Sequence, residues 1–98
     1  MFNNKKASVS GTFYPSDKTE LLNMIDNFKC KESGYFSRAV IVPHAGYIYS
    51  GELANCGISH LRQNAKNVFI FAPAHFERIF GCVTCNYDAF ETPLGNIE

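Results

Sequence analysis

Two short apolar runs, Ala-Val-Ile-Val and Val-Phe-Ile-Phe-Ala, stand out in the pattern of hydrophobic and polar positions along the chain. Each run is followed by a proline and then, within two residues, by a histidine, His44 or His75. Continuous apolar runs of this length are typical of strands that are buried on both faces of a parallel sheet. The pattern therefore predicts a βαβ unit, with parallel strands near residues 38–43 and 67–72 in one sheet.

The segment before the first run predicts a helix near residues 17–30. Ser16 or Asp17 can cap its first turn, and Glu20 lies three residues after Asp17, as in a capping box. Apolar side chains then recur at helical spacing, at Leu21, Ile25 and Phe28. This amphipathic pattern indicates a helix that places one face against the sheet.

The stretch between the two runs predicts a crossover helix near residues 51–62. Ser50 is a candidate N-cap, and Glu52 falls in the first turn, where a negative charge favours the helix dipole. Gly57 inside this helix costs about 1 kcal/mol relative to Ala, which indicates either close packing against the sheet or a weak helix. The predicted fold class is therefore α/β, a βαβ-containing sheet with flanking helices.

Composition narrows the range of functions. The 98 residues are 46% hydrophobic, enough for one core, and nine Lys and Arg balance nine Asp and Glu. This balance argues against a nucleic-acid or anionic-membrane surface, which needs a clustered excess of positive charge. The apolar runs are too short to span a bilayer, and no apolar signal-peptide region follows the first residues. We expect a cytoplasmic protein.

Four cysteines, Cys30, Cys56, Cys82 and Cys85, could form two disulfides. The chain lacks the loop-rich, signal-bearing character of secreted disulfide frameworks, so we expect reduced thiols. Cys82 and Cys85 have the spacing of a zinc knuckle, but no second such pair is present. They fall in a predicted strand over residues 81–87, where positions three apart point to opposite faces, so we interpret them as ordinary strand cysteines.

The two strand-end histidines are the candidate metal ligands. Open α/β folds bind their ligands outside the carboxyl ends of the strands, and histidine is the commonest metal ligand. His44 and His75 are therefore predicted to face one crevice, whereas we interpret His60, on the crossover helix, as a structural residue. Nearby carboxylates are alternative ligands, but solvated surface charges are the simpler interpretation for Glu77, Asp88 and Glu91.

Four motifs occur in the order and spacing of the Memo family, whose mammalian members were named as mediators of ErbB-driven cell motility. They are Ser-Gly-Thr-Phe-Tyr-Pro at 10–15, Pro-His-Ala-Gly-Tyr-Ile-Tyr-Ser-Gly at 43–51, Ala-Pro-Ala-His at 72–75 and Glu-Thr-Pro-Leu-Gly at 91–95. The resemblance implies a fold like the catalytic subunit of class III extradiol dioxygenases, with a metal at the strand ends. It matches His44 and His75 to two metal ligands, and Phe13 and Tyr49 to an aromatic pair that lines the substrate pocket.

The chain also departs from that family pattern. Family members are more than twice as long, and their third metal ligand, a cysteine, lies in the carboxy-terminal half. Ala74 stands where relatives usually carry Asn or Ser. We therefore interpret residues 1–98 as a single, incomplete Memo-like domain, which a carboxy-terminal partner chain or self-association would complete.

The resemblance implies a divalent-metal cofactor, iron first and copper second. A completed site would support redox or dioxygenase-like chemistry, and the protein would then be a non-haem metal-dependent oxidoreductase. The alternatives are a non-catalytic module that binds a peptide or small ligand, and a fragment without a function of its own. Fold alone does not decide among them, because function belongs to the site.

Overall fold

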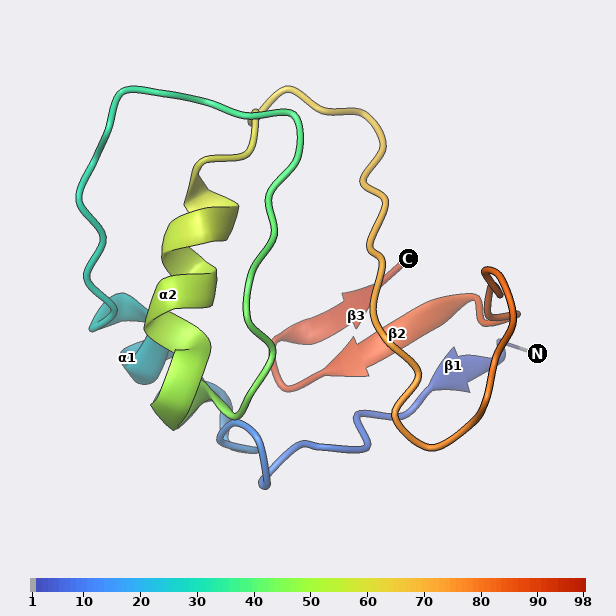
Figure 1. The fold of residues 1–98 in the computed structure, drawn as a ribbon. Coiled ribbons are helices and arrows are strands. Elements are labelled where there is room, and N and C mark those ends of the chain that lie inside the picture. The colour runs from blue at the N-terminus through green and yellow to red at the C-terminus, as the bar shows by residue number, and fades with distance from the viewer. Residues whose placement is uncertain (1) are drawn as a thin grey trace.

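The computed structural model describes residues 2–98, which form two helices and a small three-stranded sheet (Figure 1). In chain order the elements are β1 (Asn4–Lys5), α1 (Lys18–Asp26), α2 (Tyr47–Ser59), β2 (Ala89–Thr92) and β3 (Gly95–Ile97). The fold is α/β, as the sequence predicts. In this part of the chain no helix is long and apolar enough to cross a membrane.

The sheet has the strand order β1-β2-β3 and joins the two ends of the chain. β1 runs parallel to β2, with Asn4 opposite Ala89, and β2 runs antiparallel to β3, with Phe90 opposite Ile97. Since both helices lie between β1 and β2 in sequence, the parallel pair encloses a helical crossover. The β2–β3 turn ends at Gly95, whose φ of +126° is a conformation that glycine adopts without strain.

Helix α1 begins where its capping residues predict. The Asp17 carboxylate accepts a hydrogen bond from the Glu20 backbone N–H at 3.0 Å, which satisfies one of the free donors of the first turn. The helix ends at Asp26, four residues earlier than predicted. Asn27 ends it because its side-chain amide donates to the Asn23 carbonyl oxygen at 2.7 Å, a local bond that competes with helix continuation.

Helix α2 is displaced by several residues from the predicted 51–62. Gly46 is its N-cap, and the Ser50 backbone N–H donates to the Gly46 carbonyl oxygen at 3.2 Å, so Ser50 lies inside the first turn. Gly57 lies against the first apolar run, because a Cβ at this position would be 2.5 Å from Cγ1 of Val42. Close packing, rather than a weak helix, therefore explains this glycine.

The predicted strands near 38–43 and 67–72 are not strands in the structure. The nearest pairing is a single bridge between Ser37, just before the first run, and Leu61, just after α2, where the Ser37 N–H donates to the His60 carbonyl oxygen at 2.7 Å. Beyond it both segments continue as irregular chain without ladder hydrogen bonds (Figure 1). An apolar run becomes a strand only when another strand pairs with it, and the described residues provide no such partner here.

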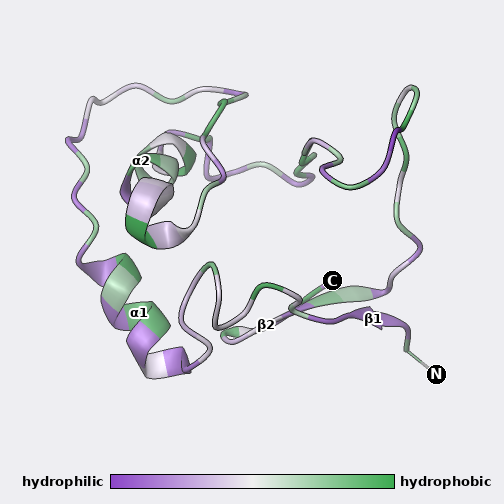
Figure 2. Ribbon diagram, turned by 60° about the horizontal axis from the view of Figure 1, so that its bottom comes forward, coloured by the Kyte–Doolittle hydropathy of each residue, from purple (hydrophilic) through white to green (hydrophobic). Residues whose placement is uncertain are grey.

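The core is small and lies among the helices and the β2–β3 hairpin. Leu21 of α1 and Ala89 of β2 are its buried hydrophobic residues. Figure 2 shows hydrophobic positions on both helices and also along the unpaired connection between α2 and β2. In that connection Ile70 is 87% exposed.

The predicted strand over 81–87 is also irregular, and its two cysteines are exposed rather than packed.

Candidate metal centre

The structure brings His44 and His75 together. Their ring centroids are 5.2 Å apart and the ring planes are tilted by 47°. The two residues come from the ends of different apolar runs, and the runs themselves are not paired at these positions. Both side chains are exposed, and the His75 ring also lies edge-on to Phe76 at 6.4 Å.

This separation suits two imidazoles on one ion. With metal–nitrogen bonds of about 2.1 Å and a ring radius of about 1.2 Å, two rings at a near-tetrahedral angle have centroids about 5 Å apart. The neutral imidazole nitrogen is the commonest metal ligand in proteins. The separation of the His44 and His75 rings is therefore compatible with one shared ion.

The loop that carries His44 is fixed at its carboxyl side. The Tyr47 backbone N–H donates to the Phe13 carbonyl oxygen at 2.8 Å, which joins the start of α2 to the turn at residues 9–14. A Cβ at Gly46 would be 3.6 Å from both the Phe13 carbonyl oxygen and the Tyr49 ring, so both groups lie within ordinary van der Waals contact of this position. The backbone two residues after His44 is thus held in place by local contacts.

Phe13 and Tyr49, the predicted pocket aromatics, flank this loop. Both lie close to Gly46, Phe13 through its backbone and Tyr49 through its ring. Their side chains are open to solvent, with exposed fractions of 47% for Phe13 and 81% for Tyr49. The two aromatics therefore lie beside the loop of His44 but do not enclose it.

The carboxylates near β2 bind residues on either side of β1. Asp88 accepts a hydrogen bond from the Asn3 backbone N–H at 2.6 Å, and Glu91 forms an ion pair with Lys6 at 3.3 Å. Among residues 2–98, no further His, Cys, Asp or Glu completes a three-ligand group with the two histidines. The site offers two protein ligands, so an ion bound to this chain alone would take its other ligands from water.

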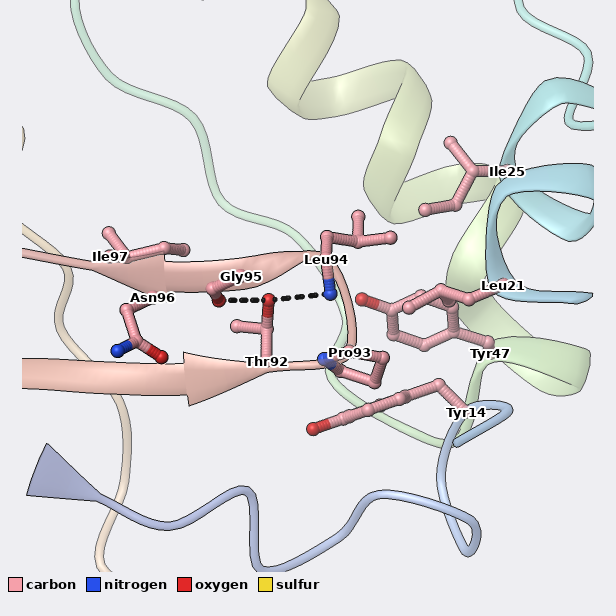
Figure 3. A pocket seen from close by; sticks show the side chains of 10 residues that line it. All are labelled: Tyr14, Leu21, Ile25, Tyr47, Thr92, Pro93, Leu94, Gly95, Asn96 and Ile97. Carbon is pink, nitrogen blue, oxygen red and sulfur yellow. Dashed lines mark hydrogen bonds between the residues drawn. The ribbon is translucent and has the colours of Figure 1, made fainter. Parts of the chain in front are cut away.

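A cavity of about 320 Å³ lies elsewhere, between α1, the start of α2 and the β2–β3 hairpin (Figure 3). Thr92 shapes its hairpin side, because its hydroxyl donates to the Gly95 carbonyl oxygen at 2.7 Å and accepts from the Leu94 N–H at 3.1 Å. The cavity is lined by Tyr14, Leu21, Ile25, Tyr47, Thr92, Pro93, Leu94, Gly95, Asn96 and Ile97. Sequence patterns did not predict it, since its walls come from three separate segments.

Two tyrosines meet at this cavity. The ring centroids of Tyr14 and Tyr47 are 5.3 Å apart, and the Phe28 ring lies 6.3 Å from Tyr47. Burial raises the pKa of the Tyr47 phenol, and the neighbouring Tyr14 raises it further. The phenol therefore stays neutral to a higher pH than a solvated tyrosine does.

The prediction that the cysteines are reduced thiols is wrong for two of the four. Cys30 and Cys56 form a disulfide with a Cα–Cα distance of 5.1 Å, whereas Cys82 and Cys85 are free, as expected. The pairing follows from the packing of the segment after α1 on α2: a Cβ on Gly51 would be 2.7 Å from the Phe28 ring. Nothing in the sequence spacing of these cysteines indicates that contact.

Comparisons with known proteins agree with the motifs. The family model described as Memo-like protein matches residues 5–98. A MEMO1 family protein of Aquifex aeolicus is 38% identical over 97 residues, which cover 96% of this chain and 36% of the relative. Protein MEMO1 of Xenopus tropicalis is 30% identical over 97 residues, covering 96% and 33% respectively. The chain thus spans about a third of the length of these curated relatives. This chain belongs to the Memo family.

Proposed function

We propose that this chain supplies two histidine ligands, His44 and His75, to a non-haem metal centre. The observation that carries the proposal is the 5.2 Å separation of the two rings, which matches a shared ion. Family membership supports it, because the two histidines stand in the motifs that resemble the Memo pattern. Iron is the first candidate metal and copper the second.

The donor set suits redox chemistry. Two imidazoles with one further anionic ligand leave open positions on a divalent metal, and a metal held in this way can bind oxygen or polarise a substrate. His44 and His75 would hold and orient the ion, and Phe13 and Tyr49 would form part of the wall against which a substrate rests. We propose a dioxygenase-like oxidoreductase as the activity of the completed protein.

Completion requires more protein than these residues provide. The third ligand and a cover for the exposed apolar run at 68–71 would come from a carboxy-terminal partner chain, or from self-association. The length ratio supports this proposal, because the matched residues make up only about a third of the curated relatives. The substrate of the completed site is a small molecule or a peptide.

A calorimetric titration of the 98-residue chain tests the metal site. With the disulfide intact, anaerobic Fe²⁺ and, separately, Cu²⁺ should each bind at one site, weakly, since water supplies most of the ligands. His44→Ala and His75→Ala should each remove this binding, and His60→Ala is the matched control that should retain it. Equal binding by all four proteins would overturn the assignment.

A second candidate function is a binding module without turnover, and the cavity in Figure 3 favours it. Its volume of about 320 Å³ is within the range of small-ligand pockets, and the Tyr14 and Tyr47 rings offer an aromatic wall. Chelator treatment separates the two functions. Ligand-induced NMR shifts at Tyr47 and Leu94 that persist in EDTA support the module, whereas loss of all ligand binding in EDTA supports the metal centre.

A further inference from the structure

A second group of metal-ligating side chains lies at the other end of α2. Cys30 follows α1, Cys56 lies in the last turns of α2 and His60 caps that helix. The two sulfur atoms and a ring nitrogen of His60 all lie within 4.8 Å of one another, and the three residues are half-buried. His44 precedes the first turn of α2, whereas Cys56 and His60 lie in its last turns and at its C-cap, so most of the length of α2 separates the two sites.

The spacing of this group is that of a helix-borne metal site. Cys56 and His60 are four residues apart, so their side chains project from one face of the helix end. Cys30 approaches the same face from the segment after α1, where the disulfide holds it. The ligand atoms thus converge from two segments that are 26 residues apart in sequence.

Hydrogen bonds already orient the His60 ring. Its Nδ1 lies 2.6 Å from the Cys56 carbonyl oxygen, and its Nε2 lies 2.7 Å from the Ser33 hydroxyl. Because a carbonyl oxygen only accepts, Nδ1 carries the proton in the neutral ring and the lone pair is on Nε2. Metal-bound histidines characteristically donate their other N–H to a carbonyl in this way.

We propose that Cys30, Cys56 and His60 bind a zinc ion when the disulfide is reduced. A dithiol reductant gives two electrons and two protons to the disulfide and leaves as its own disulfide. Zn²⁺ then displaces both thiol protons and binds two thiolates and Nε2, with water as the fourth ligand. The sulfur atoms separate to about 3.8 Å to accommodate zinc–sulfur bonds of about 2.3 Å, and the Ser33 hydroxyl gives up its contact with the ring.

Zinc suits this donor set, because thiolate ligands in a tetrahedral arrangement select zinc over harder metals. The disulfide and the zinc-bound form exclude each other, since one uses the sulfur atoms in a covalent bond and the other as ligands. Both forms tie the segment after α1 to the end of α2. The site therefore exchanges one cross-link for the other as the redox state changes, independently of the pair formed by His44 and His75.

Cobalt substitution gives a direct test. The chain is reduced with a phosphine, kept anaerobic and titrated with Co²⁺. We expect one thiolate-bound Co²⁺ per chain, with a thiolate-to-cobalt charge-transfer band and the visible bands of tetrahedral cobalt, all bleached by Zn²⁺. Cys30→Ser and Cys56→Ser should each abolish the tetrahedral thiolate spectrum, and His60→Ala should weaken binding at least about tenfold.

Three controls make the assignment specific. The Cys82→Ser/Cys85→Ser double variant retains two thiols and should keep the full spectrum, and His44→Ala should also keep it. The unreduced chain should show no charge-transfer band. A spectrum that survives in Cys30→Ser or disappears in the double variant would overturn the proposal.

Thiol alkylation provides a measurement on the unaltered chain, so the outcome does not depend on how variants fold. Zn²⁺ added to the reduced protein should slow alkylation of Cys30 and Cys56, located by mass spectrometry, and leave the rates at Cys82 and Cys85 unchanged. Equal rates at all four cysteines with and without Zn²⁺ would refute the site.

Discussion

The two helices and the β2–β3 hairpin have caps, turns and a small core, whereas the two apolar runs have none of these. Leu21 on α1 is 4% exposed and Ile70 in the second run is 87% exposed, although both are large aliphatic residues. Helical hydrogen bonds lie within one segment, so a cap such as Asp17 completes the element locally. Strand hydrogen bonds need a second chain segment, and the runs at 38–43 and 67–72 have none among the described residues.

The largest expected effect comes from removing the disulfide in the region of the two helices and the β2–β3 hairpin. The Cys30–Cys56 disulfide closes a loop of 26 residues, and reducing it in EDTA should lower the free energy of unfolding by about 3 to 4 kcal/mol. Urea unfolding followed by circular dichroism measures this loss. An unchanged urea midpoint after reduction would show that packing alone holds the two helices together and that this region does not depend on the disulfide.

Truncation of matched side chains separates the two regions directly. Leu21→Ala removes a buried side chain and should cost about 2 to 3 kcal/mol. Ile70→Ala removes an exposed one and should cost less than about 0.5 kcal/mol. Both free energies come from urea unfolding of the disulfide-bonded chain. Similar costs would mean that the second run is packed in solution, and the contrast between the regions would then fail.

Substitution of Gly57 tests whether the first apolar run packs against α2. Gly57→Ala should gain helix propensity but lose more from the contact of its Cβ with Val42, for a net destabilisation of about 1 kcal/mol. Val42→Ala frees the space, so Gly57→Ala should become neutral or stabilising in that background. The four proteins of this cycle are compared by urea unfolding. Additive effects would show that the run does not rest on α2.

The smallest effect concerns Tyr47. Its folded-state pKa is raised by burial, so its contribution to stability is complete below the unfolded pKa of about 10 and is lost as the pH rises through the higher folded value. Tyr47→Phe should flatten the decrease in thermal stability above that pH. Tyr49→Phe, on an exposed side chain, should leave the decrease unchanged. Identical pH profiles for the two variants would place Tyr47 outside the core.

Local signals in the sequence were sufficient for part of this structure. The capping pattern at Asp17 located α1, and the shared position of His44 and His75 after their apolar runs predicted that the two side chains meet. Both signals depend on short segments. The family motifs were equally informative, because several blocks matched in order.

Other features depend on contacts between distant segments and had no local signal. β-propensity in the apolar runs predicted strands, but propensity does not supply the neighbouring strand that a ladder needs. The Cys30–Cys56 pair and the cavity at Tyr47 arise from the packing of α1 against α2. For the group of Cys30, Cys56 and His60, the sequence signal is the i, i+4 spacing of Cys56 and His60. This spacing does not indicate the contact with Cys30.

Pulsed electron paramagnetic resonance of the Cu²⁺-loaded, disulfide-bonded chain tests the central claim most directly, because couplings to the remote ring nitrogens count the imidazoles on the ion. The account predicts two imidazoles in the unaltered chain, one in His44→Ala and one in His75→Ala, and two in His60→Ala. A count of two in either single variant at His44 or His75, or a loss in His60→Ala, would contradict a metal centre built on the ends of the two unpaired runs.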